Sequence, residues 1–309
     1  MHLLIPFAAP LSEAGRQAAT TLALPNLRWL MSRWAEVRRD DADEWSLSPP
    51  HERALALALG WQGACGLLPW AARAAQADGI APGDLSWGLM TPAHWHLGTE
   101  QVSLLDPATL VLDDSTSRAL FAAVLPLFLS EGYALHYGAP QRWYLAHQSL
   151  AALATASLDR VVGRNVDAWL GKDPAARQLR RLQSEVQMLL YTHPINDERA
   201  ARGLLPVNSF WLSGCGPAQP EADAAPQVDE RLRRPALADD WAAWVKAWDT
   251  LDAGPLARLR QSAADGQAAA LTLCGERAWV RFEAAPGGLM RRARALLKPP
   301  SPRALMETL

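Results

Sequence analysis

Cysteine is scarce in this chain of 309 residues, which has only Cys65, Cys215 and Cys274. The three lie far apart and form no CxxC pair. Small secreted domains are rich in paired cysteines, and metal and redox sites often use closely spaced ones. The sequence therefore argues against a disulfide framework and predicts free thiols in a reducing, cytoplasmic location.

An excess of positive charge is also missing, since 30 Lys and Arg residues face 32 Asp and Glu residues, a formal net charge of −2. Proteins that grip nucleic acid through its phosphates usually carry a basic excess or a basic stripe. The nearest candidate is a basic group near the C-terminus, made by Arg291, Arg292, Arg294 and Lys298. We interpret it as the solvated face of a helix that begins at Leu289, and we expect no nucleic-acid partner.

Long apolar runs are absent too, and none approaches the roughly 20 residues that a membrane helix needs. The opening segment Met1–Phe7 is apolar but has no basic stretch before it, and Pro6 interrupts it. This pattern is typical of a buried strand rather than of a signal peptide. We expect neither a membrane span nor a membrane partner.

Several catalytic motifs are missing as well: a Walker A loop, a GxGxxG after a strand, HExxH and GxSxG. Their absence excludes the nucleotide-binding, protease and hydrolase classes that these motifs mark. Enzymes whose residues converge from distant segments are not excluded.

Tryptophan, in contrast, is abundant, with 14 Trp against 5 Phe and 4 Tyr. Trp241, Trp244 and Trp248 recur at the spacing of one helix face. That spacing favours a core or interface position, because a helix buries one stripe of side chains. The alternatives are stacking platforms for a planar ligand or a surface for a protein partner.

The pattern of apolar residues and turn signals predicts an α+β fold, with helices packed on a mixed sheet that contains hairpins. Helices are expected at 11–39, 51–59, 68–78, 116–130, 149–170 (several short ones), 174 onward, 239–249 and 254–263, and strands at 1–7, 85–97, 101–105, 133–137, 142–146, 207–212, 268–274 and 278–284.

The division of the chain is expected to follow its composition. Residues 1–217 are predicted to form the main α+β domain. The segment 218–235 is rich in Pro, Ala and charge and predicts a flexible loop. Residues 236–309 are expected to pack on the same core as a helix–strand–helix segment, which would make one globular unit.

The densest polar cluster follows the helix that begins at Pro174. A helix exit is expected near His193, and a strand then leads into glycines. His193 is a candidate general base, and the candidate ligand-binding residues are Asn196, Arg199, Arg202, Asn208, Ser209, Gly214 and Gly216. Arginines can clamp an anion, and glycines let a ligand approach the backbone. Each residue also has a structural alternative as a helix cap, an ion-pair partner or a buried hydroxyl.

His94 and His96 form a second candidate site. Residues i and i+2 of a strand face the same side, so both imidazoles could bind one divalent metal ion. A third ligand would come from Glu100, Asp106 or His193. Two hydrogen-bonded strand histidines are the alternative.

Three stretches carry a family resemblance: LQSEVQMLLYTHPINDERAARGLLPVNSFWLSGCG from Leu182, LTLCGERAW from Leu271 and TPAHWHLG from Thr91. Over most of the chain the sequence resembles an uncharacterised proteobacterial family labelled RpfE-type regulatory protein or cofactor-independent phosphoglycerate mutase-like protein. Such mutases belong to the alkaline-phosphatase-like superfamily. The resemblance to them implies two divalent metal ions held by Asp and His, and a serine that becomes phosphorylated.

The sequence departs from the mutase pattern at its first strand. Where those enzymes have an Asp-Gly-rich metal motif, this chain reads LLIPFAAPLSEAG, with no carboxylate before Glu13. The leading interpretation is a mutase-like, RpfE-type protein that binds a small anionic or phosphorylated ligand near 193–216. The alternative is a non-catalytic regulatory protein that acts through a protein partner or as a homo-oligomer.

Overall fold

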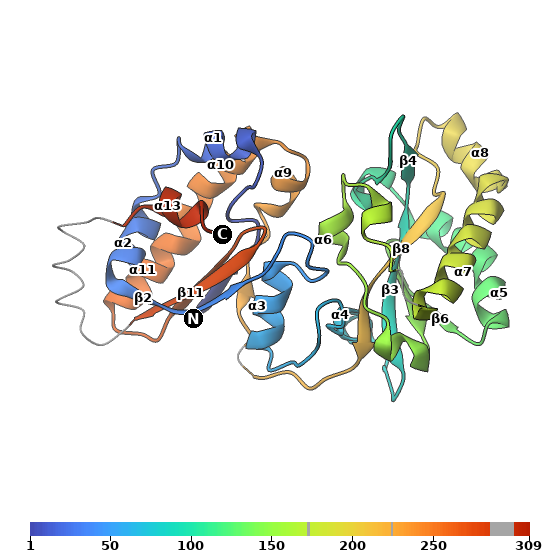
Figure 1. Ribbon diagram of the computed structural model, residues 1–309, viewed down its shortest axis with the longest axis horizontal. Coiled ribbons are helices and arrows are strands. Elements are labelled where there is room, and N and C mark those ends of the chain that lie inside the picture. The colour runs from blue at the N-terminus through green and yellow to red at the C-terminus, as the bar shows by residue number, and fades with distance from the viewer. Residues whose placement is uncertain (172–173, 224, 285–299) are drawn as a thin grey trace. The chain divides into compact units, whose positions relative to one another are not determined.

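The computed structural model describes residues 1–171, 174–223, 225–284 and 300–309, and it divides into two compact units (Figure 1). Unit 1 combines Met1–Gly60 with Glu221–Leu309, and unit 2 is Trp61–Pro220. This grouping differs from the expected main domain at 1–217. The reason is strand pairing between the two ends of the chain, which ties its first segment to its last. The predicted helix from Leu289 with its basic residues Arg291, Arg292, Arg294 and Lys298 lies outside the described residues.

Unit 1 is built on a five-stranded mixed sheet of order β2-β11-β10-β1-β9. The strands are β1 (His2–Ile5), β2 (Trp34–Asp41), β9 (Gln227–Val228), β10 (Ala270–Cys274) and β11 (Ala278–Ala284). β1 pairs in parallel with both β10 and β9, while β10, β11 and β2 pair antiparallel. The expected opening strand and the two late strands are therefore present.

Helices of unit 1 cover this sheet and carry the tryptophan stripe. They are α1 (Glu13–Ala19), α2 (Pro25–Arg33), α3 (Pro50–Ala58), α9 (Arg233–Leu237), α10 (Trp241–Leu251), the π-helical turn η4 (Asp252–Leu256), α11 (Ala257–Ala264) and α13 (Pro302–Met306). Trp244 and Trp248 on α10 are fully buried in the core of the unit. Trp241 packs edge-on against Trp244, with ring centroids 6.0 Å apart. The stripe is thus a core feature, as helical spacing favours.

Two sequence expectations in unit 1 are wrong. Residues 34–39, expected as helix, form β2, because pairing with β11 overrides the local helical pattern. The segment 218–235, expected as a flexible loop, contains β9 and the start of α9, and Leu232 is fully buried. Its backbone is fixed to β1, since the Asp229 N–H donates to the carbonyl oxygen of Leu4 at 2.9 Å.

Unit 2 contains a four-stranded antiparallel sheet of order β6-β7-β3-β8 and a small hairpin, β4–β5. The strands are β3 (Ser86–Ala93), β4 (Trp95–Leu97), β5 (Val102–Leu104), β6 (Ala134–Ala139), β7 (Arg142–Ala146) and β8 (Ser209–Pro217). The strands expected at 101–105, 133–137 and 142–146 are present, and the β4–β5 and β6–β7 pairs are hairpins of the kind that the sequence predicts. β8 runs on through the glycines to Pro217, so the predicted glycine turn is part of the strand.

Helices cover both faces of the unit 2 sheet (Figure 1). They are α4 (Trp70–Ala77), α5 (Asp114–Ser130), α6 (Leu158–Val161), α7 (Pro174–Tyr191) and α8 (Pro194–Ala201), with the 3-10 turns η1 (Pro107–Leu110), η2 (Gln148–Ala152) and η3 (Val166–Ala168). Because side chains alternate along a strand, Trp143 and Leu145 of β7 pack towards α5 and α7, whereas Tyr144 and Ala146 pack against α4. The α+β class predicted from the sequence is confirmed.

No helix in the described parts of the chain is long and apolar enough to cross a lipid bilayer.

A half-buried histidine gives unit 1 a pH-dependent stability. The Nε2 atom of His2 lies 2.9 Å from Thr272 Oγ1 on the neighbouring strand. Burial, together with Arg281 and the N-terminal amine, lowers the pKa of His2 from 6.5 to about 4. The folded state therefore binds fewer protons than the unfolded state between these values. The stability contributed by neutral His2 is present above pH 6.5 and is lost as the pH falls towards 4.

We predict that His2→Gln weakens the acid dependence of folding. Urea unfolding at pH 7 and pH 4.5 should show a smaller loss of stability for the variant than for the wild-type protein. His136→Gln, on an exposed position of β6, is the control and should behave as wild type. Equal acid sensitivity of His2→Gln and wild type would contradict the assignment.

Candidate functional site

Most predicted site residues do gather at one end of unit 2, around the segment 204–208 that leads from α8 into β8. This segment has irregular backbone, so its N–H and C=O groups need partners other than a helix or a ladder. The candidate side chains supply those partners.

Asn196 and Arg199 on α8 hold the segment from one side. The Asn196 amide accepts from Val207 N–H at 2.9 Å and donates to the carbonyl oxygens of Val207 at 2.9 Å and Leu190 at 2.8 Å. Arg199 is 2 % exposed, and it donates to the carbonyl oxygens of Leu205 at 2.9 Å and Leu110 at 2.5 Å. Burial lowers the pKa of Arg199.

His94 and Asn208 complete the set. His94 Nδ1 lies 2.8 Å from the carbonyl oxygen of Pro206. The Asn208 amide accepts from Trp95 N–H at 2.7 Å and donates to the Trp95 carbonyl oxygen at 2.9 Å. Each residue from 205 to 208 is therefore bound through one of four candidate side chains, and we call this arrangement the 205–208 network. Its polar atoms bind the chain's own backbone.

The remaining polar candidates have local roles. His193 caps α8, with Nδ1 accepting from Ile195 N–H at 3.3 Å. Ser209 is 1 % exposed, and its hydroxyl accepts from Gln187 Nε2 at 3.2 Å. Arg202 stands exposed at the C-terminal end of α8. His193 and Ser209 thus have local structural roles, and Arg202 lies at an exposed helix end.

The candidate glycines bring a helix close to β8. Gly214 has φ +64°, and a Cβ there would lie 2.9 Å from Trp70 Cβ and 3.0 Å from Ala71 N. Gly216, at φ +151°, would place a Cβ 3.3 Å from Pro69 Cβ. Residues at the start of α4 therefore occupy the space that a ligand would need. These glycines serve the packing of α4 on β8.

The described residues do not complete a metal site around the histidine pair. The rings of His94 and His96 lie 6.4 Å apart between centroids. Asp106, a suggested third ligand, caps η1 by accepting from Ala108 N–H at 2.9 Å. Among the described residues, no group of three or more His, Cys, Asp or Glu side chains is arranged to hold a metal ion. The ligands present therefore do not fit the two metal ions implied by the mutase resemblance, and no step is derived through them.

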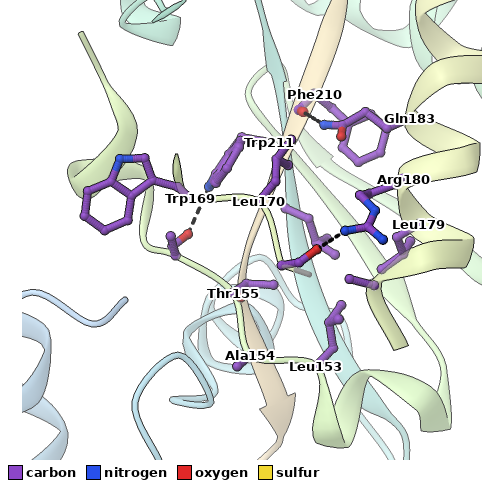
Figure 2. Close-up of a pocket in the computed structure, with 14 residues that line it drawn as sticks. Leu153, Ala154, Thr155, Trp169, Leu170, Leu179, Arg180, Gln183, Phe210 and Trp211 are labelled. Carbon is purple, nitrogen blue, oxygen red and sulfur yellow. Dashed lines mark hydrogen bonds between the residues drawn. The ribbon is translucent and has the colours of Figure 1, made fainter. Parts of the chain in front are cut away.

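A cavity lies elsewhere in unit 2, between α7, β8 and the loops that precede α7 (Figure 2). Its volume is about 50 Å³. We call it the α7–β8 cavity, and its lining consists of Leu153, Ala154, Thr155, Ala156, Trp169, Leu170, Gly171, Ala176, Leu179, Arg180, Gln183, Phe210, Trp211 and Leu212. The walls are mainly aliphatic and aromatic, with a few polar groups.

Three of those polar groups have defined hydrogen bonds, drawn in Figure 2. Gln183 Nε2 donates to the Phe210 carbonyl oxygen at 2.8 Å, and Trp211 Nε1 donates to the Ala156 carbonyl oxygen at 2.9 Å. Arg180 Nη1 donates to the carbonyl oxygen of Gly171. The first bond fixes the orientation of the Gln183 amide, because only its nitrogen can donate.

A nucleophilic thiol is not available beside this cavity. Cys215 lies on β8 and is fully buried, and burial raises the pKa of its thiol to about 12. The neutral thiol is a poor nucleophile. The chemistry of the cavity is therefore that of hydrogen bonding, charge and apolar contact.

Sequence reasoning missed Arg180 and Gln183 because both lie on α7, which was interpreted as purely structural. One signal was present. Gln183 follows Leu179 by one helical turn and precedes Val186, so a polar residue occupies the apolar face of the helix. Its exposure of 8 % confirms that position.

Comparison with known proteins gives fold likenesses only. No family model and no curated protein matches the chain. Among solved structures, the cofactor-independent phosphoglycerate mutase from Thermoplasma acidophilum is similar with 15 % identity and a TM-score of 0.38, over 100 % of this chain and 98 % of that one. The PH0037 protein from Pyrococcus horikoshii is similar with 12 % identity and a TM-score of 0.36, over 93 % and 87 %. At these values the function has to be argued from the residues themselves.

We predict that Gly214→Ala destabilises the protein far more than Gly203→Ala. Both glycines have positive φ, but a Cβ added at Gly203 would meet nothing within 4 Å. Strain alone should cost Gly203→Ala about 1 kcal/mol, and overpacking against α4 should raise the cost at Gly214 to about 3 kcal/mol. Urea unfolding measures both. Equal costs would show that α4 does not need the glycine.

A second comparison tests the 205–208 network. Asn196→Ala removes the partner of Val207 N–H and of the Val207 carbonyl oxygen, whereas the Leu190 carbonyl oxygen keeps the His193 N–H at 3.3 Å. The loss should cost about 3 kcal/mol of unfolding free energy. Arg202→Ala, at the exposed end of the same helix, should change it by less than about 0.5 kcal/mol. The network assignment fails if Asn196→Ala is as stable as Arg202→Ala.

Proposed function

We propose that unit 2 binds a small anionic ligand in the α7–β8 cavity, with Arg180 as the residue that holds the anion. The observation that carries this proposal is a cationic side chain with spare donors at the edge of an apolar cavity. Small-molecule sites commonly combine apolar walls with a few convergent polar groups.

Arg180 has the donors that such a ligand requires. A guanidinium group carries five N–H donors, and the only bond that Arg180 makes with the described residues takes one, at Nη1. It forms no ion pair with a carboxylate in the described parts of the chain. Because the side chain is half-buried, an anion that reached it would replace a modest amount of water. The guanidinium group therefore has donors left for an anion, and no described carboxylate neutralises its charge.

The proposal moves the expected anion site. The sequence suggested Arg199 and Arg202, but Arg199 binds backbone carbonyl oxygens and Arg202 stands exposed at the end of α8, outside the lining of the α7–β8 cavity. Arg180 instead lines that cavity together with the β8 segment 210–212, which lies within the expected 193–216 region. A small anionic ligand near that region remains the hypothesis, with a different arginine.

We propose binding without assigning a reaction. His193, the candidate base, has its Nδ1 atom committed to the α8 cap, and Cys215 is buried as a thiol. A ligand-binding role agrees with the regulatory alternative that the sequence left open. Mutase-like turnover of phosphoglycerate is tested separately, by following interconversion of 2- and 3-phosphoglycerate with Mn²⁺ or Mg²⁺ present and absent.

We predict that Arg180→Gln weakens anion binding by about 10- to 100-fold, which corresponds to losing one charge-assisted contact of about 1.5–3 kcal/mol. Calorimetric titration with butyrate, inorganic phosphate and 3-phosphoglycerate measures the affinity. Arg177→Gln is the matched control, since Arg177 is exposed on the same helix one turn earlier and does not line the cavity. The proposal is overturned if no anion binds, or if Arg180→Gln binds as well as Arg177→Gln.

A further inference from the structure

We infer that the ligand of the α7–β8 cavity is a short-chain aliphatic 2-hydroxycarboxylate. This inference rests on the proposed function and adds the chemical class. It follows from three features of the cavity: the free edge of Arg180, the free oxygen of Gln183 and the size and character of the apolar space.

The free edge of Arg180 suits a carboxylate. Nη1 is used by the Gly171 carbonyl oxygen, so Nε and Nη2 remain as a pair of parallel donors. Two parallel N–H groups match the two oxygens of a carboxylate and form the strong bidentate pair that arginine makes with carboxylates. A bidentate carboxylate is therefore oriented as well as bound.

The Oε1 atom of Gln183 can accept a hydrogen bond from a donor group of the ligand. Because Gln183 Nε2 donates to Phe210, Oε1 is the atom left for a ligand, and no hydrogen bond to it comes from the described residues. A second anionic oxygen would be repelled there, whereas a hydroxyl would donate. Gln183 stands three residues after Arg180, and such residues are neighbours on one helix face, about 5–6 Å apart at Cβ. A hydroxyl on the carbon next to the carboxylate fits this separation.

The lining also decides between a hydroxyl and an ammonium group. An amino acid could donate to Gln183 as well, but its ammonium would lie beside Arg180. Among the described residues that line the cavity, none is Asp or Glu. An ammonium group would therefore meet a like charge, with no carboxylate among these lining residues to compensate it, at a cost that a neutral hydroxyl avoids. The chemistry favours the hydroxy acid.

The apolar space limits the rest of the ligand. One water-sized group needs about 10–15 Å³ of such a cavity, so 50 Å³ takes on the order of three or four of them. Leu153, Ala176, Leu179 and Leu212 contribute apolar walls. A chain of two or three carbons beyond the carboxylate fits, as in 2-hydroxybutyrate, which has three. A phosphate group on that chain would bring a dianion into contact with apolar side chains. The dianion would lose its hydration there, at a large cost in free energy.

The inference is tested with ligands rather than with substitutions of Gln183, since that residue also supports β8. Calorimetric titration of the full chain compares 2-hydroxybutyrate, butyrate and 2-methoxybutyrate, which differ in the donor that Gln183 would accept. We expect 2-hydroxybutyrate to bind about 5- to 20-fold more tightly than the other two. Binding of 2-aminobutyrate should be weaker still, and 3-phosphoglycerate should bind no better than butyrate.

Two variants connect the preference to the cavity. Ala176→Leu places three more carbon atoms in the apolar space, so it should abolish binding of 2-hydroxybutyrate while circular dichroism and the melting temperature show a folded protein. Arg180→Gln should reduce binding of all carboxylates together, while Arg177→Gln should not.

The outcomes distinguish a failure of the hydroxy-acid class from a failure of the anion site. Equal affinity for butyrate and 2-hydroxybutyrate, both dependent on Arg180, would overturn the hydroxy-acid class and leave the anion site standing. Tighter binding of 2-aminobutyrate or 3-phosphoglycerate would overturn it in the same way. If only inorganic phosphate binds, the hydroxy-acid class is overturned and the anion site stands. If neither these carboxylates nor inorganic phosphate binds, or if binding is unchanged by both Arg180→Gln and Ala176→Leu, the anion site itself is overturned.

Discussion

The irregular backbone between α8 and β8 is the constraint on which the rest of unit 2 depends. A partly buried segment outside helix and sheet needs partners for its N–H and C=O groups, because each group that is buried and unpaired costs about 1–3 kcal/mol. Asn196, Arg199 and His94 supply those partners, and Asn208 fastens the end of the segment to Trp95. The start of β8 is fixed in this way, and β8 forms one wall of the cavity. The residues that the sequence suggested as a ligand site thus support the strand that lines the proposed ligand cavity.

Local signals made much of the fold predictable. The β4–β5 turn contains Gly98 and the β6–β7 turn contains Pro140. Helix α5 begins where Asp113 accepts from Thr116 N–H at 2.7 Å. β2 and β9 were missed because their strand character comes from partners far away in the sequence. Val228 pairs with Leu4, and Trp34 pairs with Ala284, contacts that no local window contains. The same long-range pairing explains the two units, since it joins the first segment of the chain to the last.

The candidate site was predictable only in part, for a related reason. Polar density marks a region but does not say whether a side chain bonds to the backbone or to a ligand. Asn196 and Asn208 each have an amide whose donor and acceptor are both taken by backbone groups, and a sequence cannot display that. Gln183 is easier to recognise in the sequence, because it is a polar residue on an apolar helix face. Arg180 gives no such signal, because an arginine on an amphipathic helix usually faces solvent.

Arg199 and Arg180 differ in solvent exposure and in the number of donors left unused, and these two properties distinguish a structural arginine from one that can bind a ligand. Arg199 is almost fully buried, and two of its nitrogens donate to carbonyl oxygens while the third, Nη1, is sealed from solvent without a partner in the described chain. Its charge lowers the stability that its hydrogen bonds provide, and no anion can reach it without moving the chain. Arg180 makes one such bond, stays half-exposed and keeps two parallel donors beside an apolar cavity. An arginine can therefore bind an anion only if its guanidinium group keeps accessible donors that no other group uses. In unit 2 Arg180 meets this criterion and Arg199 does not, although the sequence suggested Arg199.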